Sequence, residues 1–539
     1  MKKKTVSKFL TAALSCVLAL FSFAGCTVKD VPDTVDTLEI YIQELGYGIQ
    51  WLNDEIELFK QQDWVKEKYP NLNIPEPTHN AQYGYGESQI EAGAKANTAD
   101  LIFTSAEYGL QNKTDAQGQM YIADLNDIFN EKVPGEDILY KDKMFPEFEQ
   151  TSKYGDKYWS TLWSCQYQGF LYNAGTFAKL GLSTPNTTDE LIELCKSVKS
   201  QKYTSELQKD KQLDYTVMFS TRRSEAMYWQ YMAFPIWWAQ YEGMKNYENF
   251  FKGIDAISGT QDSRDVLKQQ GRLESMQVIK TVLHDYGFPD AGSIDFTEAQ
   301  NRFLVGDGLI MANGDWLYEE MRTAVNGFKD RGIECDIRFM KNPVISSIID
   351  VLPKKTVADD VELSALIKAI DAGSTALEGD GYSVAREDFD RVKSARNYVA
   401  TGYLHQAFVP SYATAKDLAK DFLRFLATDV ALNQYMKSTN GAVLPFTYDV
   451  QSADPALYES FDGIQKYRDE IFRANPEFLP STRSEEYPLS YLGGLRSVPY
   501  GAMDSEFLGA MTAKEFFDKQ VAYYAGSQWD TVLRNAGKK

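Results

Sequence analysis

The amino-acid sequence predicts an α/β protein of two lobes with a ligand cleft between them. The chain has 539 residues, too many for one hydrophobic core, so at least two domains are expected. Strand-like and helix-like patterns alternate along two consecutive stretches, which is typical of sheets covered by helices on both faces. Ligands of open α/β sheets bind outside the carboxyl ends of the strands, so we expect the binding site where the two units face each other.

Composition narrows the class of partner. The chain has 56 basic and 76 acidic residues and a net charge of -20, which argues against nucleic acid or an anionic membrane as a partner. Aromatic residues make up 13% of a polar sequence, so some rings are expected at a surface or cleft. The five cysteines have no metal-type spacing and predict no disulfide framework. Buried thiols are favoured over the alternative of one disulfide.

The N-terminus predicts export and a lipid anchor. Four lysines among the first eight residues precede an apolar stretch at 9–23, which is too short to span a membrane but right for a signal peptide. The sequence FAGC at 23–26 resembles the lipobox of bacterial lipoproteins, whose cysteine is lipidated. We therefore expect a signal peptide at 1–25, a lipidated Cys26, a polar tether at 26–36, and an extracytoplasmic protein held at the cell membrane. An ordinary signal peptide with an incidental cysteine is the alternative.

Strand and helix signals alternate at the start of the mature chain. Residues 38–43 alternate in a β-rich pattern, residues 51–69 have apolar side chains at helical spacing, and a short strand is expected near 72–74. A helix at 87–96 and a buried strand at 99–104 complete a βαβαβ unit. Parallel strands need crossover helices, so we predict a doubly wound first lobe.

A second α/β unit follows. Residues 163–173 predict a strand pair, and residues 188–200 predict a helix. A strand at 215–220 leads into an aromatic helix at about 228–238, whose rings lie all round the helix, so some are core and some are expected in a groove. A long amphipathic helix is expected at 263–286.

The most informative stretch runs from Thr297 to Met321. It predicts a helix, a Gly-Asp-Gly turn at 306–308, a buried strand at 309–312, and a new helix that begins at Trp316. A tryptophan at the mouth of a strand-to-helix turn is a candidate stacking platform for a ligand. Burial in the protein interior is the alternative, and it is the commoner role of tryptophan.

Four segments in a fixed order carry a resemblance to a known family. They are GDKYWSTLWSCQYQGFLYN, FAKLGLSTPNTTDELIELCKSV, TEAQNRFLVGDGLIMANGDW and SYATAKDLAKDFLRFLATDVALNQYM, the last followed by NGAVLPFT. Behind a lipobox, this order resembles the bacterial extracellular solute-binding proteins of sugar-importing ABC transporters, the group that includes maltose-binding protein. The resemblance covers about residues 36–450. It implies the type II fold of periplasmic binding proteins.

The resemblance also implies a division of the chain. The first lobe would comprise 37–160 and 342–426, and the second lobe 161–341 and 427–539. A charged helical segment at about 350–400 departs from the family pattern. We interpret it as an insertion on the first lobe, either a solvated decoration or an element that reshapes the cleft or contacts a partner.

Ligand-binding residues are expected from both lobes. Trp316 falls where family members commonly stack a tryptophan on a sugar ring. In the first lobe, the further candidates are Glu44 and Tyr47 after the first strand and Tyr83 in a Gly-rich loop. In the second lobe they are Trp163 and Gln168 facing the cleft, Trp238 in the aromatic helix, and Asp315 just before Trp316. Tyr491 and Arg496 are expected to return to the ligand late in the chain. A pyranose presents C–H faces to aromatic rings and hydroxyls to planar polar groups, so it needs both kinds of side chain.

The resemblance implies binding without chemistry. We expect a monomer that captures a carbohydrate, specifically an oligosaccharide. It should close around the ligand by hinge motion and deliver it to an ABC transporter permease. A peptide, a nucleoside or another solute is an alternative ligand. The histidines His79, His284 and His405 are scattered, and no zinc-protease, nucleophile-elbow, Walker or Rossmann motif occurs. We therefore expect a protein that is not an enzyme and that binds no metal or cofactor. A cell-surface glycan hydrolase is one alternative, because two of the many carboxylates could form a catalytic pair. An adhesin, or a sensory partner of a membrane kinase, is another alternative that would share the fold.

Overall fold

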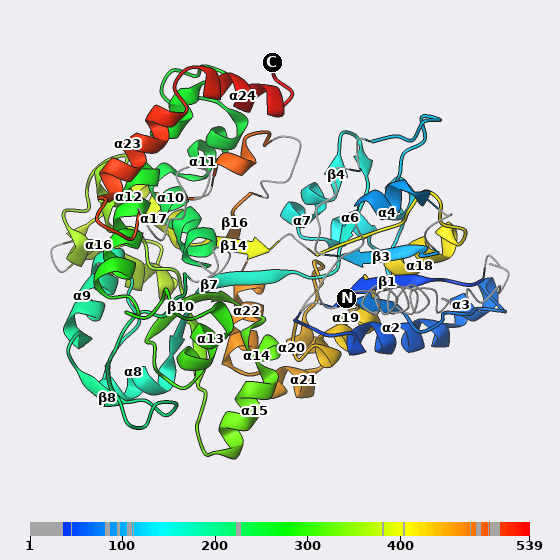
Figure 1. Ribbon diagram of the computed structural model, residues 1–539, viewed down its shortest axis with the longest axis horizontal. Coiled ribbons are helices and arrows are strands. Elements are labelled where there is room, and N and C mark those ends of the chain that lie inside the picture. Colours follow the sequence, from blue (N-terminus) through cyan, green and yellow to red (C-terminus); the bar gives the residue numbers. More distant parts are fainter. Residues whose placement is uncertain are drawn as a thin grey trace, which may run out of the picture.

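The computed structural model describes most of the chain from residue 36 onwards. The described residues are 36–44, 46–80, 87–93, 98–104, 110, 113–221, 228–379, 382–402, 405–442, 444–474, 476–480, 487–493, 495 and 507–539. The predicted signal peptide and tether with Cys26, and the candidates Tyr83 and Arg496, lie outside them. The rest form two lobes, which are joined in the middle by strand β7 (Gln166–Asn173) (Figure 1).

The first lobe is built on a five-stranded sheet. Its strand order is β2 (Thr78–Asn80), β1 (Ile40–Gln43), β3 (Leu101–Thr104), β15 (Gln406–Phe408) and β6 (Thr161–Leu162). Strand β1 is parallel to β2 and β3, whereas β15 runs antiparallel to β3 and β6. The predicted strands at 38–43 and 99–104 are confirmed. The strand expected near 72–74 is reduced to one parallel bridge between Thr37 and Asn73, and the next full strand is β2.

Helices cover this sheet. The helix predicted at 51–69 is two helices, α2 (Gln50–Gln61) and α3 (Asp63–Lys68), because Gln62 between them is extended, with φ -64° and ψ 131°. The remaining elements of this lobe are α4 (Glu87–Glu91), α5 (Asn126–Phe129), α6 (Tyr140–Lys143), α7 (Pro146–Thr151), the hairpin of β4 (Lys153–Tyr154) and β5 (Lys157–Tyr158), α18 (Lys416–Phe425), α19 (Asp429–Ser438), α20 (Val450–Ala453) and α21 (Pro455–Ser460).

The second lobe has a sheet of a different kind. Strand β7 is its centre, and β10 (Ile310–Gly314), β11 (Ile337–Met340) and β14 (Tyr398–Gly402) all run antiparallel to it. Strand β16 (Glu477–Phe478) adds parallel to β14. The strand pair predicted within 163–173 is therefore wrong, because this stretch is one long strand whose partners come from distant parts of the chain.

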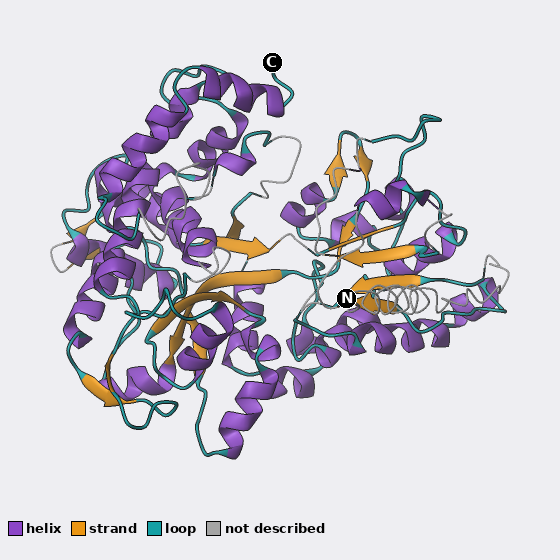
Figure 2. Ribbon diagram, viewed as in Figure 1, coloured by secondary structure: helices purple, strands orange, loops and turns teal. Residues whose placement is uncertain are grey.

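Helices form a thick layer over this second sheet (Figure 2). Helix α10 (Phe234–Glu242) is apolar all round because it packs between α12 (Gln270–Lys280) and the sheet. The other elements of this lobe are α8 (Ala174–Leu180), α9 (Thr188–Val198), β8 (Lys202–Thr204), β9 (Gln212–Asp214), η3 (Trp229–Ala233), α11 (Met244–Lys252), η4 (Arg264–Lys268), η5 (Thr281–Asp285), α13 (Phe296–Leu304), α14 (Leu317–Glu320), α15 (Arg322–Asp330), η6 (Ser346–Val351), α16 (Asp360–Asp371), β12 (Glu378–Gly379), β13 (Tyr382–Ser383), α17 (Arg386–Arg396), α22 (Gly463–Arg473), η7 (Ser490–Leu492), α23 (Ala513–Tyr523) and α24 (Ser527–Asn535).

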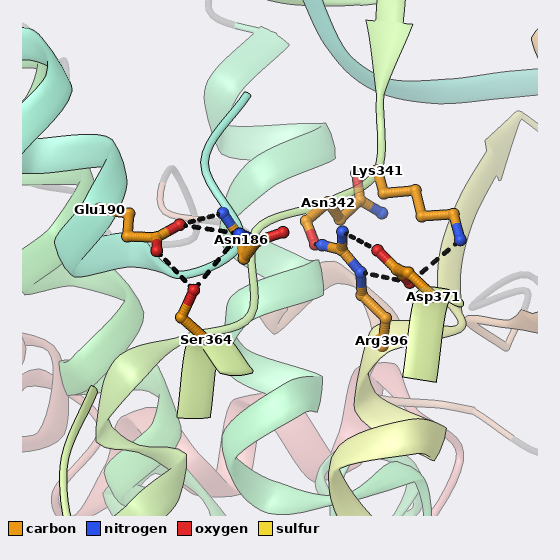
Figure 3. Close-up of polar contacts among 7 residues, drawn as sticks. All are labelled: Asn186, Glu190, Lys341, Asn342, Ser364, Asp371 and Arg396. Atoms are coloured by element: carbon orange, nitrogen blue, oxygen red, sulfur yellow. Dashed lines mark hydrogen bonds and ion pairs between the residues drawn. The ribbon is translucent and has the colours of Figure 1, made fainter. Parts of the chain in front are cut away.

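The segment predicted as an insertion on the first lobe packs on the second lobe instead. Arg396 at the end of α17 pairs with Asp371 at 2.7 Å and donates to the carbonyl of Asn342 at 2.7 Å (Figure 3). Ser364 of α16 contacts Asn186, just before α9. The placement of 342–402 in the first lobe is therefore wrong. Both helices bury an apolar face against the second lobe, α17 also buries Asp388 and Arg396, and β14 joins the β7 sheet.

The chain returns to the first lobe after β14. Strand β15 completes the first sheet, and α19 packs on α2, where the Tyr435 ring lies 5.1 Å from the Trp51 ring. Residues 429–438, predicted in the second lobe, thus belong to the first lobe because a buried aromatic contact holds them there. Helix α22 then packs on β11 of the second lobe.

Candidate functional site

The loops that follow β1 and β10 bring the two lobes into contact. Strand β1 ends at Gln43, and the loop after it contains Gly46. A Cβ atom at Gly46 would lie 3.7 Å from the Cβ of Glu320 at the end of α14. This loop of the first lobe therefore lies against the helix that begins after Trp316, as expected if ligand-binding residues come from both lobes.

Trp316 is half-buried and precedes α14 as its N-cap residue. Its indole folds back over Gly314, because a Cβ at Gly314 would lie only 2.0 Å from the indole ring. Its ring meets the Tyr228 ring edge to face, with centroids 6.2 Å apart and planes at 80°. The glycine is thus needed for this indole orientation, and part of the indole stays accessible.

Two polar side chains lie beside this indole. Gln300 of α13 is buried, and its Nε2 donates to Oε2 of Glu320 at 2.8 Å. Glu320 as a whole residue is exposed, but its carboxyl group is partly desolvated. This burial raises the carboxyl pKa, while hydrogen bonds from Gln300 and Trp316 oppose the rise. We call the set Tyr228, Gln300, Trp316 and Glu320 the Trp316 platform. It combines aromatic faces with a carboxylate, the combination that a sugar ring requires.

The sequence prediction named only Trp316 of this platform. Glu320 could have been found, because a residue four positions after Trp316 lies on the same side of a helix. Tyr228 immediately precedes η3 and Gln300 lies on α13, so the two residues are far apart in the sequence. Only the tertiary structure brings them together.

The two candidates after β1 flank the contact at Gly46. Glu44 is half-buried, its backbone N donates to the carbonyl of Asn80 at 2.8 Å, and its carboxylate pairs with His79. Tyr47 is buried, and its hydroxyl accepts from Nε2 of Gln166 at 3.5 Å. Burial raises the pKa of Tyr47, and the charge of Asp315 in the second lobe adds to the rise. Tyr47 therefore lies at the lobe junction, whereas the partners of Glu44 belong to β2 of the first lobe.

Asp315 is buried and does not reach solvent. Its Oδ2 accepts from Nη1 of Arg468 at 3.3 Å, and its backbone N donates to the carbonyl of Tyr167 at 3.0 Å. Burial raises the pKa of Asp315 to about 6, and Arg468 opposes the rise. Gln168 is half-buried on β7 opposite Gly314, so it lies at the base of the platform.

The other two predicted tryptophans lie in the cores of the lobes. Trp163 is 1% exposed and stacks on Trp51, with centroids 5.4 Å apart. Trp238 is 0% exposed, and its indole N–H donates to Oε1 of Gln269 at 2.7 Å. Neither belongs to the Trp316 platform. Tyr491 lies in η7, and its side chain is outside the described part of the structure.

A cavity of about 900 Å³ lies on the other side of α14. It is lined by α14, α15 and β11 of the second lobe and by Lys437, Ser438 and Asn440 of the first. Tyr318 is the aromatic residue of its lining. The Tyr318 hydroxyl accepts a hydrogen bond from the backbone N of Ile337 at 2.8 Å. The cavity is lined by charged groups of both signs and by a single aromatic side chain, whereas the Trp316 platform combines two aromatic rings with a carboxylate.

The described residues show no metal cluster and no disulfide. Cys165, Cys195 and Cys335 are free and buried, which confirms the preference for buried thiols. Among the described segments, no group of three or more histidine, cysteine, aspartate or glutamate side chains is arranged to hold a metal ion. None of the described helices has the length and apolar character needed to cross a bilayer.

A family model described as "Bacterial extracellular solute-binding protein" matches residues 51–432. A xylose/arabinose-binding protein of Haloferax volcanii is 24% identical over 189 residues, 34% of this chain. The matched part spans only 35% of that relative, about a third of its length.

Solved structures of similar fold cover nearly the whole chain. A chitin oligosaccharide binding protein has a TM-score of 0.53 and 14% identity, over 92% of this chain and 99% of its own. The GacH receptor of Streptomyces glaucescens, solved unliganded and with acarbose, has a TM-score of 0.54 and 12% identity, over 93% of this chain and 99% of its own. At this identity the likeness concerns the fold, and the predicted two-lobed α/β fold is confirmed.

Proposed function

Because the chain belongs to the bacterial extracellular solute-binding proteins, we propose that it captures a carbohydrate between its two lobes and delivers it unaltered to an ABC transporter permease. The ligand we propose is an oligosaccharide. The protein acts as a monomer, closes around the ligand, and needs no cofactor. The Trp316 platform is the observation that carries this proposal.

The platform supports a sugar because of how its groups are arranged. The half-buried Trp316 indole is braced by Gly314 beneath it and by the edge of Tyr228. A braced ring loses little conformational entropy when a ligand stacks on it. The Glu320 carboxylate is oriented by Gln300 and would accept hydrogen bonds from hydroxyls of a pyranose stacked on the indole.

The position of the platform supports closure of the lobes on a ligand. Glu320 lies beside Gly46 of the first lobe, so a sugar on the platform would also meet the loop after β1. A ligand that contacts both lobes favours their closed arrangement in proportion to the contacts formed only there. A permease can then distinguish loaded from empty protein by shape.

The relatives support the class of ligand. The relative from Haloferax volcanii is named for xylose and arabinose, one similar structure is named for chitin oligosaccharide, and the GacH receptor was solved in complex with acarbose. For the anchor, the lipobox-like FAGC at 23–26 supports lipidation of Cys26 at the outer face of the membrane. Palmitate labelling of wild type and Cys26→Ala would test this anchor.

Calorimetry with a panel of oligosaccharides tests the function. We expect one or more sugars to bind with micromolar or tighter affinity, and to stabilise the fold by about 2.7 kcal/mol at a hundredfold excess over Kd. The same mixtures, followed by chromatography, should contain intact sugar only. Release of new reducing ends, lost when a carboxylate at the lobe junction is changed to its amide, would establish a hydrolase instead.

Peptides and nucleosides belong in the same panel. If they stabilise the protein while no sugar does, the carbohydrate assignment is wrong, although the family membership is unaffected. If a sugar binds, Trp316→Ala should weaken it without unfolding the protein.

A further inference from the structure

The Asp315–Arg468 pair lies directly behind the Trp316 platform and has no part in the proposed sugar contacts. Both side chains are 1% exposed, and Nη1 of Arg468 lies 3.3 Å from Oδ2 of Asp315. Nε and Nη2 of Arg468 and Oδ1 of Asp315 have no hydrogen-bond partner among the described residues. The pair is therefore the main polar interaction of each of these two buried side chains.

Asp315 is held at two points, and Trp316 follows it in the chain. Its backbone N is bonded to the Tyr167 carbonyl on β7, and its side chain is bonded to Arg468 on α22. Gly314 before it has no Cβ, which allows the indole to lie directly over the backbone at that position. We propose that Arg468 is a positioning residue, which fixes Trp316 by holding the side chain of Asp315. This inference rests on the proposed role of Trp316 as the ligand platform.

Several ionisable groups surround Asp315 and interact with its charge. The ionisable groups that sense it come from several elements: Tyr47 after β1, Cys165 and Tyr167 at the start of β7, Tyr435 on α19, and Arg468 on α22. Burial raises the pKa of each of the tyrosines and of the thiol, so these groups stay neutral near neutral pH. Two further acids lie near Arg468, Asp462 at the start of α22 and Asp469 on it, and burial raises the pKa of each. The His405 ring lies 6.3 Å from the Tyr47 ring. The contribution of Asp315 must therefore be isolated with the variant Asp315→Asn.

Protonation of Asp315 has a defined consequence. Burial raises its pKa to about 6, so above pH 6 the carboxylate accepts from Arg468. Below that pH the neutral acid loses its ion pair, and the side-chain hold on Asp315 weakens. The indole that follows should then change its environment. Glu320 also faces the indole, with a carboxyl pKa that is raised by burial, so its contribution must be separated.

Fluorine NMR of protein labelled with 5-fluorotryptophan tests this without a ligand. The chain has nine tryptophans, and Trp316→Phe identifies the resonance of Trp316. We expect that resonance to titrate between pH 5 and 8 with a midpoint near the Asp315 pKa of about 6. The titration should vanish in Asp315→Asn and persist in Glu320→Gln. The Trp238 resonance should not move with it.

Arg468 variants give the sharper result. Arg468→Met removes the cation that opposes the rise of the Asp315 pKa, so the midpoint should move up by at least one pH unit, whereas Arg468→Lys should leave it nearer the wild-type value. A flat Trp316 resonance in wild type, or a titration that persists in Asp315→Asn or disappears in Glu320→Gln, would overturn the proposal. These spectra are recorded without sugar, so they test the positioning role of Arg468 independently of sugar binding. Either proposal can be contradicted while the other is supported.

Discussion

Two tryptophan clusters lie near the lobe junction, and they differ in how completely they are enclosed. In the first lobe, the Trp51 and Trp163 rings stack and meet Phe103 and Tyr435 edge to face or nearly so, which we call the lobe 1 ring cluster. In the second lobe, Trp316 meets the edge of one ring, that of Tyr228, among the described side chains. The first set fills a core, and the second leaves part of an indole available.

The contrast shows what makes an aromatic residue suitable for a ligand. Both clusters contain tryptophan, and in both the tryptophans lie next to strands in the chain. Trp51 follows β1, Trp163 precedes β7, and Trp316 follows β10. What differs is the number of protein rings against each indole and the backbone beneath it. Gly314 under Trp316 supplies a surface without a side chain, whereas Trp163 is covered on all sides at 1% exposure.

The largest expected effect comes from cutting into the lobe 1 ring cluster. Trp163→Ala should lower the free energy of unfolding by about 3–5 kcal/mol, because it removes a fully buried ring and leaves a cavity. Urea denaturation followed by circular dichroism measures this. If Trp316→Ala lowers stability as much as Trp163→Ala, the distinction between the clusters is wrong.

A methyl group beneath the indole tests the platform from the other side. Gly314→Ala places a Cβ 2.0 Å from the Trp316 ring, so the indole must move. We expect a loss of about 1–3 kcal/mol of stability from overpacking, together with weaker sugar binding. Gly327→Ala on α15 is the matched control, because no atom lies within 4 Å of its Cβ. Equal sugar affinity in both variants would contradict the proposed indole orientation.

Glu55 gives the first lobe a pH dependence of stability close to the lobe 1 ring cluster. It is buried on α2, its carboxyl oxygens have no partner among the described residues, and burial raises its pKa well above the usual value. A raised carboxyl pKa makes stability fall as pH rises. Each pH unit between the unfolded and folded pKa should cost about 1.4 kcal/mol.

Glu55→Gln should remove this dependence. We expect the variant to gain stability over wild type as the pH is raised from about 4.5, with the two proteins similar in stability below it. Thermal unfolding at a series of pH values measures the difference. Parallel stability curves for the two proteins would show that the Glu55 carboxyl is not the group responsible.

The sequence predicted the parts of the fold that depend on local patterns. The alternation at 38–43, the apolar run at 99–104 and the strand-to-helix turn before Trp316 all form near the expected positions. The second sheet was not predicted, because antiparallel pairing of β7 with β10, β11 and β14 depends on contacts far apart in the sequence. For the same reason the 350–400 segment was assigned to the wrong lobe.

The candidate site shows the same limit. Trp316 could be named from the turn that carries it, but Trp163 and Trp238 looked equally suitable until their burial was known. Asp315 was expected to touch the ligand, yet its position behind the indole, paired with Arg468, makes it a support. Burial and partners are properties of the packed chain, and no local pattern encodes them.

Calorimetric titration of Trp316→Ala with the tightest sugar of the panel tests the central claim most directly. Trp64→Ala is the control, because Trp64 is also half-buried but lies on α3 at the outer end of the first lobe (Figure 1). We predict that Trp316→Ala weakens binding by about 1–3 kcal/mol while Trp64→Ala leaves it unchanged. Unchanged affinity in Trp316→Ala, or an equal loss in both variants, would contradict the account.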